Sequence, residues 1–349
     1  MLDFYKNKKV FITGHTGFKG TWLCQTLLKA GATVTGFALQ PPTNPSFFNQ
    51  LNTEKEINSI ITDIRNKEEL IKAVKNTKPD IVFHMAAQPI VRLSYAQPYE
   101  TYEINVMGTV NILEAIRLTP SVRSFVNVTT DKVYENREWH WGYRENENLC
   151  GYDPYSNSKS CSELVTHSYR NSFFSNEKSC AISTARSGNV IGAGDYAQDR
   201  IIPDCIRASE NNKEIIIRNP SSTRPYQHVL DCLSGYLILA QKEYGNKTLE
   251  GAYNFGPNEE SCITTGNLAA LFCDTWGQNA SWKIQGDGGP HEANFLKLDC
   301  SKAKTVLGWQ PRWDIKTAVE KTIEITKLKL YDEKKICLDK QISEYFNYV

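Results

Sequence analysis

The feature of this 349-residue sequence that most constrains its fold is a glycine-rich turn after a short apolar run near its start. The run Lys9 to Thr13 predicts a buried strand, and Thr21 to Ala30 carries apolar side chains at helical spacing. A glycine loop between a strand and a helix lets the backbone approach a pyrophosphate, while the helix N-terminus supplies amide donors. We therefore expect a dinucleotide cofactor at this loop, which comprises Gly14, His15, Thr16, Gly17, Phe18, Lys19 and Gly20.

Strand-like and helix-like segments continue to alternate through the first half of the chain. Further strands are predicted at 33–39, 60–62, 80–85 and 123–129, and helices at 67–75 and around 99–118. Such alternation is typical of parallel sheets whose crossover connections are helices. The sequence therefore predicts an α/β protein with a doubly wound parallel sheet of the Rossmann type.

The alternation ends after about residue 186, where glycine, proline and arginine become prominent. A helix at 230–242 and a strand at 252–255 return to the earlier pattern, and an amphipathic helix is expected at 314–330. We expect a dinucleotide-binding domain from residues 1–186 and 229–257, and a smaller C-terminal substrate-binding lobe from residues 187–228 and 258–349.

Composition excludes several classes of protein. The chain is 40% hydrophobic with a net charge of +1 and has no basic block, so a nucleic-acid surface is not expected. No apolar run approaches the ~20 residues of a membrane helix, and a strand begins within ten residues of Met1, which leaves no room for a signal peptide. The ten cysteines form no Cys-x-x-Cys pair, so we expect no metal site and a reducing, cytoplasmic setting.

The identity of the dinucleotide is less constrained. The second strand ends without the acidic residue that grips an adenosine ribose, so NAD is expected but NADP stays open. Lys19 is a candidate partner for a 2′-phosphate, and the alternative is that it contacts the pyrophosphate or solvent. Asp63 and Ile64, just past the third strand, are candidates for the adenine, although a surface turn explains Asp63 equally well. Small residues after the fourth strand would let the backbone lie against a ribose at Ala86, Ala87 and Gln88.

Tyr155 and Lys159 stand four residues apart, which places them on one face of a helix. An ammonium near a phenol stabilises the phenolate and gives a base that works near neutral pH. The same spacing arises by chance on solvated helices. Its position after a fifth strand, in a chain with a dinucleotide loop, favours catalysis and cofactor contact.

The loop after the fifth strand contains Thr130, Asp131 and Lys132. Ligands bind at this edge of such sheets, and Thr130 is suited to a sugar hydroxyl. Asp131 and Lys132 pair an acid with a potential base, which elimination of water requires but reduction or epimerisation does not. A surface ion pair is the alternative.

The sequence resembles the nucleotide-sugar dehydratases of the extended short-chain dehydrogenase/reductase family, and within it the group acting on CDP-glucose. The resemblance covers most of the chain, and Lys132 stands where the relatives acting on dTDP-glucose have glutamate. The stretches that carry it are 14–20, 131–132, 141–145, 151–159, 186–192, 224–229, 253–257 and 307–311.

This resemblance implies dehydration of a nucleotide-activated hexose to its 4-keto-6-deoxy form, for deoxysugars such as those of lipopolysaccharide O-antigen. Tyr155 takes the 4-hydroxyl proton, Asp131 protonates the departing 6-hydroxyl, and Lys132 is either the carbon-5 base or only orients Asp131. A homodimer through the helices around 99–118 and 155–174 is also implied.

Arginine forks suit a pyrophosphate, although any one arginine is more often a surface residue. Candidates for substrate binding are Gln88, Asn189, Arg200, Arg218, Arg224 and His291. Three rival functions share most of these features: a dehydratase for dTDP-glucose or GDP-mannose, a nucleotide-sugar 4-epimerase, and a non-catalytic nicotinamide-binding sensor.

Overall fold

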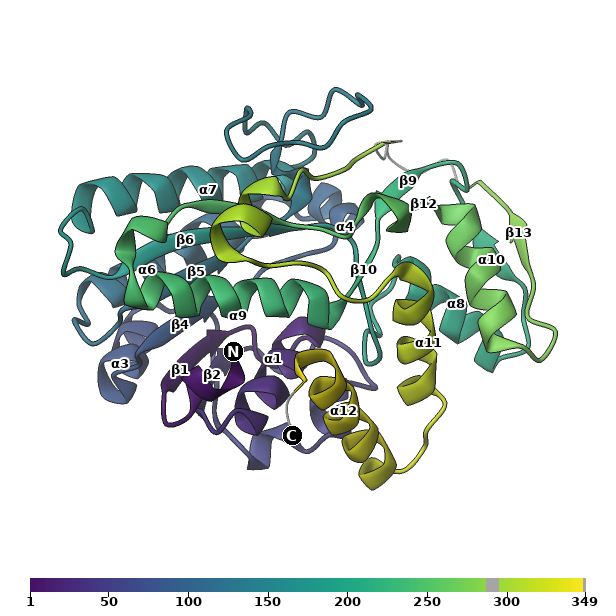
Figure 1. Ribbon diagram of the computed structural model, residues 1–349, viewed down its shortest axis with the longest axis horizontal. Helices are drawn as coiled ribbons and strands as arrows, with labels where there is room; N and C mark the ends of the chain where they lie inside the picture. The colour runs from purple at the N-terminus through teal and green to yellow at the C-terminus, as the bar shows by residue number, and fades with distance from the viewer. Residues whose placement is uncertain (287–294, 348–349) are drawn as a thin grey trace.

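A seven-stranded parallel sheet forms the centre of the computed structural model, which describes residues 1–286 and 295–347 (Figure 1). Its strand order is β11-β6-β5-β4-β1-β2-β3, and all neighbours are parallel. The order reverses direction between β1 and β4, which confirms the predicted doubly wound sheet. The strands are β1 (Lys9–Thr13), β2 (Thr33–Ala38), β3 (Asn58–Ile61), β4 (Ile81–His84), β5 (Ser124–Val128), β6 (Ala181–Ser187) and β11 (Ala252–Phe255).

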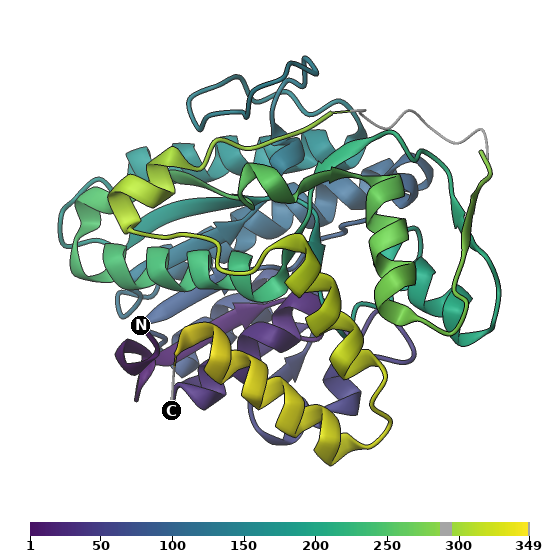
Figure 2. The same cartoon turned by 45° about the vertical axis from the view of Figure 1, so that its right-hand side comes forward.

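Helices cover both faces of this sheet (Figures 1 and 2). On one face, Leu70, Ile112 and Val165 pack with the buried side chains of the strands. On the other, Trp22, Leu237 and Leu338 do so. The helices of the first face are α3 (Lys67–Thr77), α6 (Gly108–Arg117) and α7 (Pro154–Phe173), and those of the second are α1 (Phe18–Lys29), α9 (Val229–Gly245) and α12 (Tyr331–Phe346).

Two predicted helices differ from the observed ones for local reasons. Helix α1 begins at Phe18 rather than Thr21, because Gly17 already serves as its N-cap. The helix predicted around 99–118 comprises α5 (Pro98–Tyr102), a single π-turn η3 (Glu103–Met107) and α6. A π-turn inside a helix frequently marks a functional site.

A second, smaller core lies beside the sheet, where Ile206, Phe272 and Val319 pack together. Figure 2 shows these elements to one side of the main layers. They are β7 (Val190–Ile191), α8 (Ile201–Glu210), β8 (Ile215–Ile217), β9 (Thr223–Pro225), β10 (Gln227–His228), β12 (Cys262–Thr264), α10 (Thr265–Trp276), β13 (Trp282–Ile284) and α11 (Ile315–Thr326). Short helices elsewhere are η1 (Leu2–Tyr5), α2 (Phe47–Gln50), η2 (Thr53–Lys55), α4 (Val91–Ala96), η4 (Asp131–Val133), η5 (Lys247–Leu249), η6 (Glu259–Ser261) and η7 (Ala303–Leu307).

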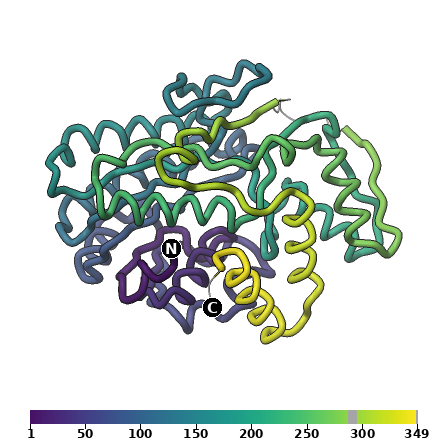
Figure 3. Tube along the Cα trace, in the orientation of Figure 1, coloured from purple at the N-terminus to yellow at the C-terminus, as the bar shows by residue number. Residues whose placement is uncertain are grey.

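Helix α12, which the sequence pattern does not predict, contacts α11 of the smaller core but places its buried side chains in the large one. Leu338, Ile342 and Tyr345 join the cluster that contains Trp22 of α1. Lys335 binds Glu56 at 3.1 Å and donates to Gln25 of α1. The traces of α1 and α12 run side by side, near both marked chain ends (Figure 3). The division into two lobes remains a prediction, and this packing adds α12 to the large core.

Within 1–286 and 295–347, no helix is long and apolar enough to cross a membrane. The same residues contain no cluster of three metal-ligating side chains.

Candidate active site

The glycine loop brings β1, α1 and the end of β4 closer together than side chains would allow. Gly14 has φ +77°, and a Cβ there would lie 2.7 Å from the Ala86 nitrogen. A Cβ on Gly20 would lie 2.2 Å from the Gly14 carbonyl oxygen, whereas one on Gly17 would meet only that oxygen, at 3.5 Å. Gly14 and Gly20 are therefore required by the fold, and Gly17 leaves space at the start of α1, where no side chain in the described structure caps the helix. That arrangement fits a pyrophosphate.

His15 and Thr16 anchor the loop to the neighbouring strands. The buried His15 ring hydrogen-bonds the Ser59 hydroxyl at 2.8 Å and occupies the space left by Gly36. Burial lowers the pKa of His15 to about 4, so the ring is neutral at physiological pH. Thr16 donates to the Leu39 carbonyl at 2.9 Å. Contact between these residues and a cofactor would therefore come mainly from their backbone.

Lys19 faces the interior rather than the end of β2. Its ammonium lies 5.8 Å from the centre of the Tyr236 ring. Burial lowers its pKa, and it interacts electrostatically with Arg200 and Asp131. Phe18 lies close to Gly192, which has no side chain. This position favours the pyrophosphate over a 2′-phosphate as the partner of Lys19.

Asp63 and Ile64 have protein partners. Asp63 pairs with Arg65 at 2.6 Å, and Arg65 also pairs with Glu103 of η3 at 2.7 Å. The hydrogen bond from Arg65 lowers the pKa of Asp63. Ile64 is buried in the core beneath α6, and a Cβ on Gly108 would lie 3.0 Å from it.

Beyond β4, Ala86 lies against Gly14, and Thr13 accepts hydrogen bonds from the backbone of this segment. The next residue, Ala87, is half-buried. The Gln88 side chain bonds Ile90 and Thr101 with both ends of its amide. It is therefore committed to holding the strand end, and its predicted contacts with cofactor and substrate gain no support from the geometry.

The sequence around Tyr155 places it in the first turn of α7. Asp153 caps the helix by accepting from the Ser156 backbone, and Pro154 occupies the first helical position. Burial raises the pKa of Tyr155 to about 12, while a hydrogen bond with Thr130 and the charge of Arg200 oppose the rise. Thr130 and Tyr155 therefore belong to the same site.

Lys159 lies one turn further along the same helix. Its amine donates to the Val128 carbonyl of β5 at 3.2 Å. Burial lowers its pKa to about 7; the charge of Lys19 lowers it further and that of Glu163 opposes. Lys159 is therefore close to half-protonated at neutral pH.

Asp131 is completely buried, which is not the position of a surface ion pair. Its Oδ1 accepts from Thr130 and from Lys132 Nζ, each at 3.0 Å. Its Oδ2 is buried without a hydrogen-bond partner among the described residues and faces Gly188, whose Cβ would lie 3.2 Å away. Lys132 is 29% exposed. The loop therefore holds a buried carboxylate oxygen without a hydrogen-bond partner in the described structure, and a partly accessible amine, next to Thr130.

The predicted substrate-binding residues lie in different surroundings. Arg200 pairs with Asp195 at 3.0 Å and acts electrostatically on Tyr155, so it belongs to the same site. Asn189 has a buried Oδ1 without a partner in the described structure. Arg218 pairs with Asp199 at 2.8 Å, and the buried Arg224 donates to the Thr223 carbonyl within β9. His291 lies outside the described residues.

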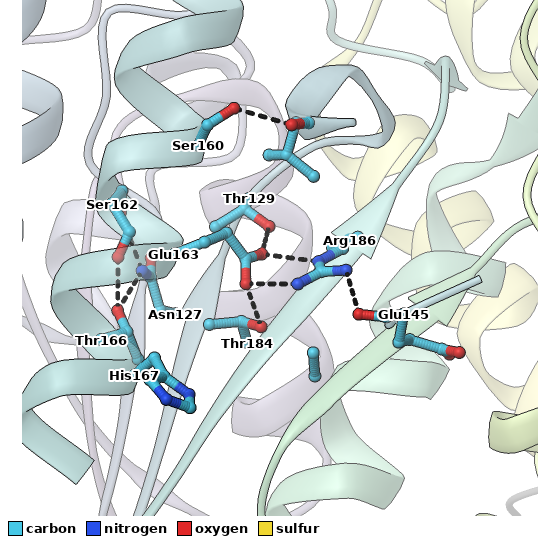
Figure 4. A network of polar contacts seen from close by, with 12 residues as sticks. Asn127, Thr129, Glu145, Ser160, Ser162, Glu163, Thr166, His167, Thr184 and Arg186 are labelled. Carbon is cyan, nitrogen blue, oxygen red and sulfur yellow. Dashed lines mark hydrogen bonds and ion pairs between the residues drawn. The ribbon is translucent and has the colours of Figure 1, made fainter. Parts of the chain in front are cut away.

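Two residues that the sequence pattern does not single out form a buried ion pair behind the site. Glu163 of α7 and Arg186 of β6 are each 3% exposed and make two hydrogen bonds, both 2.9 Å long (Figure 4). One signal was available, because Glu163 continues the four-residue spacing of Tyr155 and Lys159. A charged residue at that spacing on a buried helix face requires a partner.

A cavity of about 990 Å³ opens at the β6–β11 edge of the sheet. Its lining includes Glu163, Arg186, Lys247 and Lys302, but none of the predicted catalytic residues. The geometry around Asp131 and Tyr155, rather than cavity size, therefore identifies the reacting centre.

Comparisons with known proteins agree with this geometry. A family model described as GDP-mannose 4,6 dehydratase matches residues 11–322. CDP-glucose 4,6-dehydratase of Salmonella typhimurium is 50% identical over 356 residues, covering 99% of each chain. dTDP-glucose 4,6-dehydratase of Streptomyces antibioticus is 30% identical and covers 70% of this chain and 69% of its own. UDP-glucuronic acid 4-epimerase of Bacillus cereus shares the fold, with a TM-score of 0.79, 24% identity and coverage of 94% and 99%.

Proposed function

The chain belongs to the nucleotide-sugar 4,6-dehydratase family described by the GDP-mannose 4,6-dehydratase model, and from that premise we propose that it dehydrates CDP-glucose to CDP-4-keto-6-deoxyglucose. The observation that carries the proposal is the buried Asp131 carboxylate, paired with Lys132 and linked through Thr130 to Tyr155. Elimination of water needs this second acid and base in addition to the tyrosine. The choice of nucleotide follows the relative that is 50% identical over nearly the whole chain.

NAD is the proposed cofactor, and the solved epimerase of the same fold is a complex with NAD. The backbone of residues 14–20, the Ala86–Ala87 segment, Tyr155 and Lys159 would hold it, because the glycines leave space and the start of α1 offers amide donors. When bound, NAD would supply the hydride chemistry, namely acceptance of a hydride from carbon 4 and its return to carbon 6.

The side chains divide the proton transfers. Tyr155 accepts the proton of the 4-hydroxyl and, because its pKa is raised by burial, needs the charges around it to form a phenolate. Ketone formation acidifies the carbon-5 proton, and we assign its removal to Lys132, whose amine must enter this step neutral and leaves it as the ammonium. Asp131 protonates the departing 6-hydroxyl through the unpartnered Oδ2, so it must enter this step as the neutral acid. Thr130 orients the sugar, and Arg200, Asn189 and Arg224 would bind the nucleotide.

The test is a panel of nucleotide hexoses incubated with purified protein, followed by mass spectrometry. Loss of one water from CDP-glucose supports the proposal. An isomer of unchanged mass would indicate an epimerase, and an unchanged panel would indicate a sensor.

A homodimer is part of the proposal. Exposed apolar side chains lie on the outer surfaces of η3 and α7, at Met107, Leu164 and Phe173, and on α5 at Tyr99. A second copy of the chain would cover them. Sedimentation of the purified protein measures this directly. The ten cysteines are free and suit a reducing cytoplasm, which we also propose as the location.

A further inference from the structure

Every side-chain nitrogen and oxygen of the Glu163–Arg186 ion pair has a hydrogen-bond partner, as charges this deeply buried require. Each Glu163 oxygen accepts one bond from Arg186 and one from a threonine, Thr129 at 2.5 Å or Thr184 at 2.7 Å. Burial alone would raise the pKa of Glu163, but the charge and hydrogen bonds of Arg186 bring it below its ordinary value. The pair is therefore ionised and rigidly held.

The two members of the pair hold opposite ends of the loop that carries Asp131 and Lys132. Glu163 accepts from Thr129, which precedes the loop. Arg186 donates at 2.8 Å to the hydroxyl of Tyr134, which follows it. The Tyr134 hydroxyl in turn donates to Asn254 of β11 at 2.7 Å. The segment 130–133 is therefore anchored at both ends to one ion pair.

The element that supplies Glu163 also supplies Tyr155. Two further bonds run from α7 to the chain before and after Asp131. Lys159 donates to the Val128 carbonyl at 3.2 Å. Ser160 donates to the Val133 carbonyl at 2.7 Å (Figure 4). One face of α7 thus carries the phenol and fixes the chain on both sides of Asp131. These bonds therefore fix how far Asp131 and Lys132 lie from Tyr155.

Resting on the proposed function, we propose that Glu163 and Arg186 are positioning residues for the elimination step. They hold Asp131 and Lys132 against a sugar that Tyr155 has already engaged. Tyr155 and Lys159 are carried by α7, and Thr130 is the residue of the loop that acts on Tyr155. Loosening the loop therefore slows loss of water much more than oxidation at carbon 4.

Thr129→Val and Tyr134→Phe test this inference, because each removes one hydroxyl and leaves the ion pair in place. A displacement of the loop by about 1 Å is expected to slow elimination roughly 100-fold, and to slow oxidation by a clearly smaller factor. Glu163→Gln should show the same difference between the two steps. Arg186→Lys, which keeps the positive charge, should retain part of the elimination rate. The readouts are single-turnover absorbance of the reduced nicotinamide and deuterium uptake at carbon 5.

Matched controls come from the opposite ends of the same strands. Glu243 of α9 is buried and accepts from Ser124 of β5 at 2.7 Å and from Ser183 of β6. Ser124→Ala and Glu243→Gln should lower the melting temperature without changing the balance between oxidation and elimination.

The outcomes separate the two proposals. If the unmodified protein dehydrates no nucleotide hexose, the proposed function fails. If it does, and the Thr129 and Tyr134 variants slow both steps equally or neither, the pair only stabilises the fold. A crystal structure of Thr129→Val adds a readout independent of turnover, since an unmoved Asp131 would also overturn the inference.

Discussion

At the scale of single residues, the reacting groups owe their properties to what surrounds them. Tyr155 and Asp131 are both buried. Thr130 and Arg200 oppose the rise in the pKa of Tyr155 that burial causes. Asp131 keeps one oxygen without a partner in the described structure. The sequence predicted which residue types are present and their spacing along the chain. It could not predict that Arg200, forty-five residues beyond Tyr155, supplies a charge beside the phenol.

Tyr155→Phe should lose activity while binding substrate nearly as before. The phenylalanine fills the same buried space but cannot accept the 4-hydroxyl proton. Turnover is expected to fall at least 10²–10⁴-fold, the range of a general base, by roughly the same factor in kcat as in kcat/KM. Steady-state kinetics and calorimetric binding measure the two effects, and near-normal turnover would contradict the assignment.

Asp131→Asn and Lys132→Ala should oxidise carbon 4 and then stall. Asparagine keeps the size of Asp131 but has no acidic proton for the leaving hydroxyl, and alanine removes the carbon-5 base. Reduced nicotinamide should accumulate in a single turnover while dehydrated product falls at least about 100-fold. If Lys132→Ala still exchanges the carbon-5 proton at the parent rate, Lys132 only orients Asp131.

The lowered pKa of Lys159 predicts a specific dependence of stability on pH. Because the pKa is about 7 in the folded protein and 10.5 ordinarily, the unfolded chain binds more protons between these values. The contribution of Lys159 to the free energy of unfolding therefore rises with pH across that window, by at most about 1.4 kcal/mol per pH unit, and its penalty is complete below pH 7. Denaturant titrations of cofactor-free protein at several pH values give the free energy of unfolding as a function of pH. This free energy should rise less steeply with pH for Lys159→Met than for the parent. An equal pH dependence for the two proteins would mean that Lys159 is not desolvated.

At the scale of elements, the predictable parts are those whose pattern is local. Strand β1 occupies the predicted Lys9–Thr13 because an apolar run and a glycine define it. Strand β6 reads Ala-Ile-Ser-Thr-Ala-Arg-Ser, and its buried Arg186 is acceptable only because α7 provides Glu163. Helix α12 has partners spread along the chain: Lys335 donates to Gln25, 310 residues earlier, and Tyr345 donates to Asp231, 114 residues earlier. A short stretch of sequence cannot predict contacts with residues this far away along the chain.

The glycine loop offers a test that separates folding from cofactor binding. Gly20→Ala places a Cβ 2.2 Å from the Gly14 oxygen and should cost about 1–3 kcal/mol of stability, as overpacking does. Gly17→Ala meets only ordinary contacts, so its melting temperature should stay close to the parent value while retained NAD falls about tenfold or more.

Gly245→Ala, at the end of α9 with nothing within 4 Å of its Cβ, is the matched control. It should change neither quantity appreciably. If Gly17→Ala retains NAD as the control does, the backbone at that position does not approach the cofactor.

At the scale of the whole molecule, the site forms where the smaller core meets the sheet. A Cβ on Gly188 would lie 2.6 Å from Pro225 of β9 and 3.2 Å from Asp131, so both parts crowd one point. Residues of both parts would contact the nucleotide, and selectivity is therefore a property of the assembled molecule.

CDP-glucose should be preferred over dTDP-glucose and GDP-mannose by at least about tenfold in kcat/KM. The expectation rests on Lys132 and on the close relative that acts on CDP-glucose. Specificity constants measured for the three nucleotides decide it, and equal values for any two that include CDP-glucose would refute it.

The contact between α1 and α12 can form only after the ribosome has synthesised both helices. The core that contains Leu2, Tyr5 and Trp22 is completed by Leu338 and Ile342. At ribosomal rates of about 5–20 residues per second, roughly 15–60 s separate synthesis of the two helices. Throughout that interval the nascent chain exposes part of its largest apolar surface, so protection by chaperones would matter most before the last helix emerges.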